Sequence, residues 1–425
     1  MRPSPSISTR AAALLRRWCV AYLLLRALPF PLDVFPLDPI PGVRAGLHAL
    51  LAPWRGLVGW VGGSLFGVAV DPRRGAVLDS ASAYVEAACV AALALVIALA
   101  APRRTGALDL SSRAFDRARA YAALALGARL LPYGWQKLIP TQMPEPGPDR
   151  LIIPYGDMSP MGVLWTFMGT SPGYEALTGL IEVLAATLLF WRRTRLLGAA
   201  LATLALAHVV ALNFGYDVAL KVSSLHLLAL ALFVLSAERR RLLAVLLLAP
   251  TIPPREPDPP PSARPWRRWS AWGLKLALLL AISLRNVVAC VDFLSTRGSL
   301  APASPLHGVY RVDAFTRGGV AELADDRRWL RVGLNRAGTA AIQRADGHGI
   351  RYGLTIDAPR GALTFTPAAG GEAFVLRFTA TLDGGLRLAG VVDGAHTIAT
   401  LSREPEVRSP AKVRFRWVVD GFVNH

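Results

Sequence analysis

Long apolar runs, interrupted by a few ionisable residues, dominate the chain as far as residue 290. The clearest of them lie at Tyr121–Ile139, Tyr174–Trp191, Leu196–Phe214 and Val218–Ser236. Each is about as long as the roughly 20 residues that a helix needs to cross the core of a bilayer. The pattern therefore predicts four consecutive membrane-spanning helices in the middle of the chain.

Further apolar runs flank this group. The run at about Trp18–Phe30 predicts a short first span, because no convincing small-residue cleavage site of a signal peptide follows it. Ala81–Ala101 predicts a second span and Ala271–Val288 a seventh. The glycine-containing stretch 45–70 is expected at the outer interface, as an amphipathic or re-entrant element. Counting it as a span would put the arginine-rich loop 102–119 outside, against the positive-inside rule.

The pattern changes after residue 296 to short alternating runs separated by turn-forming residues. The runs recur about every ten residues, and turns such as NRAG, RADGHG and LDGG lie between them. This spacing is typical of antiparallel strands in a small barrel or sandwich, so we expect about eight or nine strands. Examples lie at Gly308–Ala314, Trp329–Leu334, Ile350–Ile356, Ala362–Thr366, Ala373–Thr381, Leu386–Val391, Thr397–Leu401 and Val413–Val419.

These patterns divide the chain into five parts. Residues 1–118 are expected to form an N-terminal membrane region with two spans, and residues 119–241 a four-helix membrane module. The proline-rich stretch 242–269 is expected to be a stiff cytoplasmic linker. Residues 270–290 are the seventh span, and 296–425 the β domain. The predicted fold class is a polytopic α-helical membrane protein, with about seven transmembrane helices, followed by a soluble all-β barrel or sandwich.

Composition and charge fit a membrane protein better than a nucleic-acid-binding protein. The chain has 425 residues, 53% of them hydrophobic, and a formal net charge of +18. The basic residues form no amphipathic face interleaved with aromatic residues, so we do not expect nucleic-acid binding. They flank the apolar runs, where the positive-inside rule places them in cytoplasmic segments. We therefore expect a multi-pass inner-membrane protein with a cytoplasmic N-terminus and an extracytoplasmic C-terminal domain.

The cysteine pattern argues against thiol and metal chemistry. Cys19, Cys89 and Cys290 lie in or beside apolar runs, without a CxxC motif or a Cys/His metal spacing. Ligand patterns of a flavin, haem or iron–sulfur protein are also missing from the sequence. We expect neither a metal site nor an intrinsic cofactor.

Four ionisable residues in the central runs are the candidates for catalysis: Arg129, Glu182, His208 and His226. If the four helices alternate in direction, these side chains lie within about two helical turns of one level. An ionisable group in hydrocarbon is costly unless it finds a partner, so such residues often mark function. We predict a layer of one Arg, one Glu and two His in the bundle. The alternative is structural, with an ion pair and two hydrogen-bonded histidines that lock the helices together.

A second group of candidates, expected to bind a ligand, lies towards the predicted outer face. The connection 140–173 is rich in Gly, Pro and aromatic residues, and loops of this length are usually functional or disordered. Its Trp165 and Phe167 are expected to belong to a lid. A solvated surface pair is the plainer interpretation of Asp217 and Lys221. The full group is Tyr133, Gln136, Lys137, Trp165, Phe167, Asn213, Asp217 and Lys221.

A series of motifs in the middle of the chain resembles a known family. The motifs are Arg129, PYGWQK at 132–137, GDMSPMGVLWTFMGTSPGYEALTGLIE at 156–182, RRTRLLGA at 192–199, LNFGYDVALK at 212–221 and Ser224–Leu227. In this order they resemble the DoxX family of bacterial membrane proteins, a four-helix module. The resemblance covers about a quarter of the chain, at 127–236. The C-terminal domain is more loosely similar to lipocalins.

The resemblance implies membrane redox work, since families of this type include a thiosulfate:quinone oxidoreductase subunit. We expect a quinone, or a similar apolar ligand, between the helices of the module, in a redox complex whose partner protein supplies the electrons. Arg129 or His208 would donate hydrogen bonds to the ligand. Glu182 or His226 would relay protons.

Two other functions remain open from the sequence. The protein can be a non-enzymatic scaffold or anchor, whose β domain binds a ligand, a lipid or another protein outside the cytoplasm. Transport of a small molecule is less consistent with the pattern, because the predicted helices show no inverted repeat.

Overall fold

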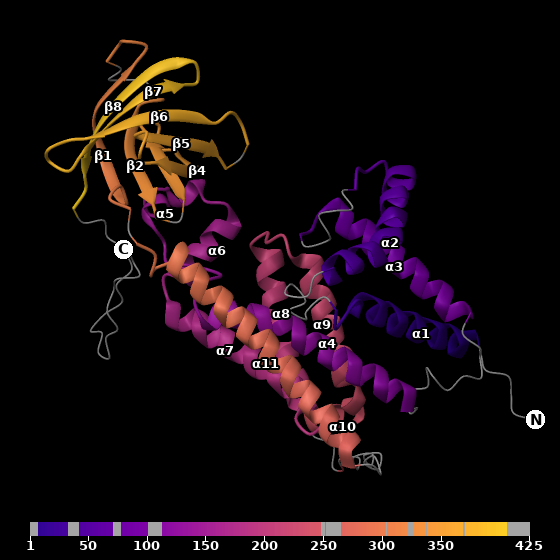
Figure 1. The fold of residues 1–425 in the computed structure, drawn as a ribbon. Helices are drawn as coiled ribbons and strands as arrows, with labels where there is room; N and C mark the ends of the chain where they lie inside the picture. The colour runs from indigo at the N-terminus through magenta and orange to yellow at the C-terminus, as the bar shows by residue number, and fades with distance from the viewer. Residues whose placement is uncertain are drawn as a thin grey trace, which may run out of the picture. The chain divides into compact units, whose positions relative to one another are not determined.

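Two compact units make up the chain (Figure 1). The helical unit contains Met1–Ile139 and Leu177–Val288, and the barrel unit contains Pro140–Ala176 and Ala289–His425. The structure is a computed structural model, and it describes residues 7–32, 42–70, 78–100, 113–247, 251, 265–302, 304–321, 326–336, 338–368 and 370–405.

Apolar helices build the helical unit, and every run expected to span the membrane is helical. In the described part of the chain, four segments are long and apolar enough to cross a membrane: α3, α8, the stretch from α9 into α10, and α11. The helices α1, α4 and α7, which contain ionisable residues, are not among these four segments. The helices are α1 (Ile7–Ala27), α2 (Val43–Phe66), α3 (Ala81–Ala100), α4 (Arg113–Leu138), α7 (Pro172–Leu189), α8 (Arg195–Gly215), α9 (Lys221–Leu235), η3 (Ser236–Glu238), α10 (Arg239–Leu246) and α11 (Pro265–Thr296).

Small residues let α4 and α7 approach each other closely. A Cβ added at Gly134 would lie 2.9 Å from the backbone N of Val183, and one added at Gly179 would lie 2.2 Å from the backbone N of Leu138. In a bilayer, close packing holds helices together, because lipid tails are as apolar as the side chains. The two glycines therefore fix how α4 and α7 face each other.

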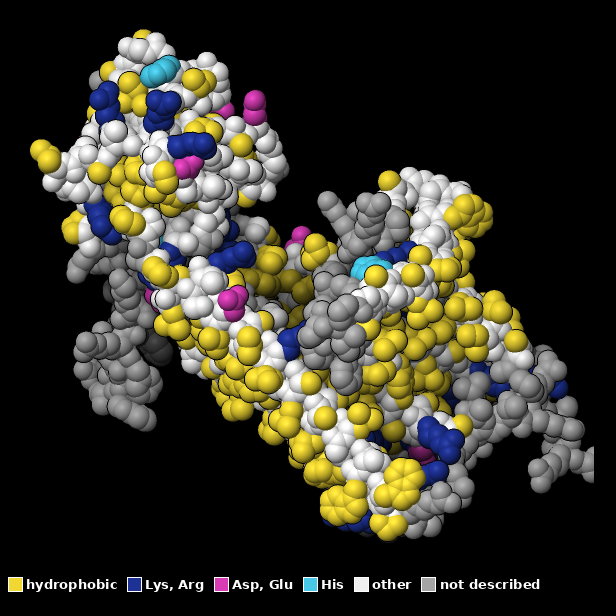
Figure 2. All heavy atoms as spheres, viewed as in Figure 1, with side chains coloured by type: hydrophobic (Ala, Val, Ile, Leu, Met, Phe, Trp, Pro, Cys, Tyr) yellow, Lys and Arg dark blue, Asp and Glu magenta, His cyan; other side chains and the backbone are white. Residues whose placement is uncertain are grey.

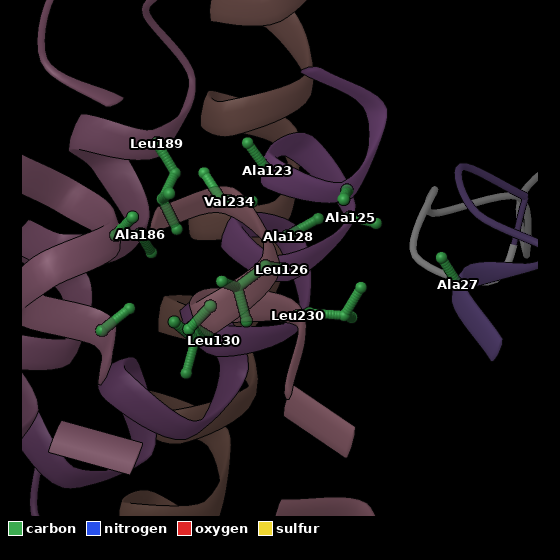
Figure 3. Close-up of a cluster of buried hydrophobic side chains, with 14 of the residues drawn as sticks. Ala27, Ala123, Ala125, Leu126, Ala128, Leu130, Ala186, Leu189, Leu230 and Val234 are labelled. Atoms are coloured by element: carbon green, nitrogen blue, oxygen red, sulfur yellow. The ribbon is translucent and has the colours of Figure 1, made fainter. Parts of the chain in front are cut away.

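Leucine and alanine side chains fill the core of the helical unit. Leu126 and Leu130 of α4, Leu189 of α7, and Leu230 and Val234 of α9 lie in one buried cluster (Figure 3). Many other large apolar side chains point outward, and they cover most of the visible face of this unit (Figure 2). An exposed apolar surface of this extent is typical of contact with lipid.

The C-terminal domain is a closed antiparallel barrel in which strands adjacent in sequence pair, and β1 pairs with β8. Aromatic and aliphatic side chains, among them Tyr310, Trp329 and Phe365, pack its interior. The prediction of a small antiparallel β domain is confirmed, and it is a barrel. The strands are β1 (Gly308–Arg317), β2 (Trp329–Asn335), β3 (Thr339–Arg344), β4 (Gly349–Asp357), β5 (Ala362–Pro367), β6 (Phe374–Ala380), β7 (Leu386–Val392) and β8 (Ala395–Arg403).

Residues 140–176 belong to the barrel unit, although the sequence groups them with the four-helix module. This segment contains α5 (Pro148–Leu151), η2 (Tyr155–Asp157) and α6 (Pro160–Gly169). The Asp149 carboxylate, which is 1% exposed, accepts hydrogen bonds from Asn335 at 2.8 Å and Arg351 at 2.7 Å. Through these contacts the segment packs against the barrel.

Three expectations fall wholly or partly outside the described residues. They are the arginine-rich loop at 102–112, the linker at 248–250 and 252–264, and the last expected strand, Val413–Val419.

Candidate functional site

A buried ion pair joins α4 and α7. The Nζ atom of Lys137 lies 2.6 Å from Oε1 and 2.8 Å from Oε2 of Glu182. Lys137 is 7% and Glu182 4% exposed. Lys137 lies three residues after Gly134, and Glu182 lies three residues after Gly179. These are the two glycines that bring the helices together. Because residues three apart share one face of a helix, the glycine contact carries the lysine and the carboxylate to each other.

Arg129 of α4 binds the C-terminal end of α1. Its guanidinium donates hydrogen bonds to the carbonyl oxygens of Arg26 and Ala27, both at 2.9 Å, and to that of Leu28 at 3.4 Å. The last carbonyls of a helix lack partners within the helix and carry partial negative charge. Arg129 therefore compensates the end of α1.

Tyr22 of α1 and His226 of α9 form a second polar contact. The Tyr22 hydroxyl is hydrogen-bonded to Nε2 of His226. The ring centroids lie 5.4 Å apart. Both side chains are partly buried in the helical unit. The pair can pass a proton between a phenol and an imidazole, and it also joins two helices that are far apart in the sequence.

A third polar contact lies at a pocket formed by α1, α2 and α3. Arg26 Nη1 lies 3.6 Å from Glu86 Oε2, and the indole of Trp54 donates to Glu86 Oε1 at 3.5 Å. These residues line a pocket of about 400 Å³ whose walls are mostly aliphatic. The Nε atom of Arg26 is buried and has no hydrogen-bond acceptor among the described residues. A donor in this state is costly unless a ligand or a water molecule satisfies it.

Electrostatic interactions relate these separate contacts to one another as a group. Tyr22 lies within electrostatic range of Arg26 and Glu86, and His226 within range of Arg26 and Arg129. Tyr133 lies within range of Arg129 and of Glu182. We call the group the polar chain. Its members are Glu86, Arg26, Tyr22, His226, Arg129, Tyr133, Glu182 and Lys137.

Three of the four residues predicted to form a catalytic layer belong to the polar chain: Arg129, Glu182 and His226. His208 of α8 instead has an exposed side chain. The position of a residue along its helix predicts its level in the membrane but not the direction in which its side chain points. The sequence also did not assign Tyr22, Arg26 or Glu86 to the site, although Arg26 interrupts an apolar run and was a visible signal.

The predicted ligand-binding residues at the turn between α8 and α9 hold that turn together. The Asn213 amide donates to Ser224 Oγ at 3.0 Å, and Lys221 Nζ lies 2.6 Å from Asp217 Oδ1. Asp79 accepts from the backbone N–H of Lys221 at 2.8 Å, which caps α9. This arrangement agrees with the plainer interpretation of the Asp217–Lys221 pair.

The other predicted ligand-binding residues are divided between the two units. In the helical unit, Gln136 is partly buried on α4, beside Lys137 in sequence. In the barrel unit, the Trp165 indole donates to the Gln142 carbonyl at 3.1 Å. Phe167 is 62% exposed. Among the described residues, no group of three or more His, Cys, Asp or Glu side chains is arranged to hold a metal ion.

Comparison with known proteins identifies one uncharacterised relative. No family model matches the chain, and no solved structure matches it significantly. The uncharacterized protein YwoB of Bacillus subtilis (strain 168) is 30% identical over 127 residues, which are 30% of this chain and 80% of YwoB. At this identity and coverage the two proteins are homologous over the matched region. The chain therefore belongs to the same family as YwoB.

Proposed function

We propose that the chain is a DoxX-like inner-membrane protein that binds a quinone, or a similar apolar ligand, at the pocket end of its polar chain. One observation carries the proposal. Arg26, whose buried Nε–H has no acceptor among the described residues, lines an apolar pocket of about 400 Å³. A pocket of this size, with few polar groups and mostly apolar walls, is typical of small-molecule sites.

The pocket residues suit the two parts of a quinone. Leu25, Val58 and Val90 offer an apolar surface to the ring and the tail, and Arg26 offers a hydrogen-bond donor to a carbonyl oxygen. The Glu86 carboxylate, 3.6 Å from Arg26, is an acceptor for a proton at the same place. When bound, a quinone would supply electron transfer coupled to protons. A partner protein would supply the electrons, because the sequence has no pattern for a redox cofactor of its own.

The rest of the polar chain then serves to move or hold protons. Histidine and tyrosine in contact can exchange a proton, and Tyr22 and His226 are hydrogen-bonded to each other. The permanent charge of Arg129 stabilises negative charge on neighbouring groups. The Lys137–Glu182 pair is the last member of the polar chain. It is a buried ion pair whose net charge is zero, which a low-dielectric environment tolerates.

For the membrane topology we propose seven spans, with the N-terminus in the cytoplasm and the barrel outside it. Exposed arginines, Arg192, Arg193, Arg239 and Arg240, lie after α7 and at the start of α10, as the positive-inside rule requires of a cytoplasmic end. The packing of residues 140–176 with the barrel also supports this topology, because both must then lie on the same side of the membrane.

Single cysteines test the topology directly. In a variant without the three native cysteines, Tyr155→Cys should react with an impermeant maleimide added outside intact cells. Tyr155 is 75% exposed. Arg240→Cys should react only after the membrane is permeabilised. Equal labelling of the two positions in intact cells would contradict the seven-span arrangement.

Mass spectrometry of co-purifying quinones tests the proposed ligand. The full chain should carry quinone in near-stoichiometric amount. The double variant Arg26→Gln/Glu86→Gln should lose it while remaining folded, because both charges of the pair are removed together. Asp217→Asn/Lys221→Gln is the matched control, since this ion pair does not line the pocket, and it should keep the quinone. Quinone that is absent from the wild type, or equal in all three proteins, would contradict the proposal.

The second candidate function is that of an anchor that presents the barrel to a ligand or a protein. An open groove of about 770 Å³ on the barrel favours it. The groove combines apolar and charged side chains, including Phe374, Arg377 and His396. If no quinone co-purifies, and a barrel variant such as Arg377→Ala abolishes binding of a soluble partner, this second function is the better explanation.

A further inference from the structure

The helix α2 contributes a second arginine to the pocket formed by α1, α2 and α3. The residues of α2 that line this pocket are spaced three and four apart, so they share one face of the helix. They are Leu51, Trp54, Arg55 and Val58. Arg26 lies in α1, so the two arginines reach the pocket from different helices. The pocket therefore has two separate groups of strong hydrogen-bond donors.

Arg55 keeps hydrogen-bond donors for a ligand beyond its contact with His48. Its Nη1 atom lies 2.9 Å from Nδ1 of His48. A guanidinium has several N–H donors and no acceptor, so the imidazole nitrogen is the acceptor in this contact. The contact occupies only part of the guanidinium and supplies no negative charge. Arg55 can therefore stay bonded to His48 and still donate to a ligand in the pocket.

Glu86 holds residues of α1 and α2 at the same place in the pocket. Its Oε1 atom accepts from the indole of Trp54 at 3.5 Å, and its Oε2 atom lies 3.6 Å from Nη1 of Arg26. Trp54 precedes Arg55 in the sequence and lines the same pocket, so an indole ring accompanies the two arginines. Aromatic rings favour stacking with another flat ring. These groups together suit a flat, apolar ring that carries hydrogen-bond acceptors.

We propose that the pocket recognises a 1,4-quinone through both of its carbonyl oxygens, with Arg26 as the donor to one and Arg55 as the donor to the other. The inference rests on the proposed function and narrows it, because it separates a quinone from apolar ligands that have a single polar end. The two carbonyls of a 1,4-quinone lie on opposite sides of one ring, and each finds an arginine. A ligand with one carbonyl leaves one arginine without an acceptor, and sites built to bond a polar group reject analogues that lack it.

Competition between two ligands of matched shape tests the inference. The full chain in lipid nanodiscs binds radiolabelled 2,3-dimethyl-1,4-naphthoquinone, unlabelled ligands compete for the site, and empty nanodiscs give the blank. The second ligand is 2,3-dimethylchromone, which keeps the flat fused rings and both methyl groups but has a ring oxygen in place of one carbonyl. The wild type should bind the quinone at least about tenfold more tightly than the chromone, the effect expected for one hydrogen bond to a charged group.

Arg55→Met removes the donors of Arg55 and keeps a long side chain. It should weaken quinone binding about tenfold and leave chromone binding unchanged, because Arg26 still serves a single carbonyl. Arg55→Lys, which returns a cationic donor, should restore part of the loss. The control is Arg16→Met, because Arg16 is exposed on α1 and does not line the pocket. It should leave the affinity for both ligands unchanged.

Equal affinity of the wild type for the quinone and the chromone would overturn the inference and leave the quinone site itself in place. Equal weakening of both ligands by Arg55→Met would also overturn it, because Arg55 would then support only the shape of the pocket. If the wild type binds neither ligand, the proposed function fails and the inference fails with it. The comparison of the two ligands on the wild type needs no variant, so it decides the matter even if Arg55→Met does not fold.

Discussion

Lys137 and Glu182 form a buried ion pair in which the ammonium lies within 2.8 Å of both carboxylate oxygens. Removing one partner leaves the other charge buried and unpaired, which typically costs about 3–5 kcal/mol of stability. We therefore expect Glu182→Gln to lower the free energy of unfolding in mixed micelles by about 3 kcal/mol. A loss of function in this variant alone would not separate a functional role from a structural one.

The double variant Lys137→Met/Glu182→Leu separates the two roles. Replacing a buried pair with apolar side chains of similar size is often neutral or stabilising, so this variant should unfold within about 1 kcal/mol of the wild type. If the pair serves the polar chain, quinone-linked activity should still fall. A double variant that is as unstable as Glu182→Gln would show that the pair contributes packing or hydrogen bonds that apolar side chains cannot replace.

The close approach of α4 and α7 predicts that a larger residue at Gly179 destabilises the helical unit. The Cβ of Gly179→Ala would lie 2.2 Å from Leu138 N and 2.6 Å from Gly134 O, so the helices must separate. Overpacking of this kind costs about 1–3 kcal/mol, which unfolding in mixed micelles should detect. Gly273→Ala in α11 is the control, because nothing lies within 4 Å of its added Cβ. It should be neutral or stabilising by about 0.5–1 kcal/mol. Equal effects of the two substitutions would contradict the close packing.

Asp149 is expected to hold residues 140–176 on the barrel. Because its buried carboxylate pairs with Arg351 and Asn335, Asp149→Ala should destabilise the attachment by about 1.5–3 kcal/mol. Limited proteolysis should then cut within this segment faster than in the wild type. Asp313→Ala is the control, because its pair with Arg311 is solvent-exposed and should contribute little. Unchanged cleavage in Asp149→Ala would mean that other contacts hold the segment.

The Asp157–His348 contact predicts a pH-dependent attachment in the same unit. The two side chains hydrogen-bond at 2.8 Å, which raises the pKa of His348 above 6.5 and lowers that of Asp157 below 3.8. The stabilisation from His348 is complete below pH 6.5 and is lost as the pH rises through its folded pKa. That from Asp157 is complete above pH 3.8 and is lost as the pH falls through its folded pKa.

Hydrogen exchange can measure this attachment. After correction for the intrinsic rates, the backbone amide of Gly349, which donates to Asp157 at 2.7 Å, should be better protected at pH 5.5 than at pH 8.5. His348→Gln should remove most of that difference. Protection that rises with pH in the wild type would contradict the assigned direction.

The sequence predicted the helices and the β domain well because both follow from simple periodicities. Long apolar runs such as Leu196–Phe214 reflect the length needed to cross a bilayer, and α8 covers Arg195–Gly215. Alternation over runs such as Trp329–Leu334 reflects the two faces of a strand, and β2 covers Trp329–Asn335.

The candidate site was only partly predictable. The position of Glu182 along its helix grouped it with the other ionisable residues. Its pairing with Lys137 depends on how α4 and α7 are rotated about their axes, which the two glycines fix. Tyr22 and His226 are 204 residues apart, and no pattern in the sequence joins them. The attachment of residues 140–176 to the barrel includes the buried carboxylate of Asp149, which resembles any other loop aspartate in the sequence.

Photolabelling with a quinone analogue tests the central claim, that the pocket between α1, α2 and α3 binds a quinone. After irradiation of the full chain in lipid nanodiscs, peptide mass spectrometry should find the label on pocket residues such as Leu25, Val58 and Val90. Excess unlabelled quinone should block the labelling, and Arg26→Gln/Glu86→Gln should abolish it. Label on the barrel, or label spread over the outer faces of the helices and not displaced by excess quinone, would contradict the claim.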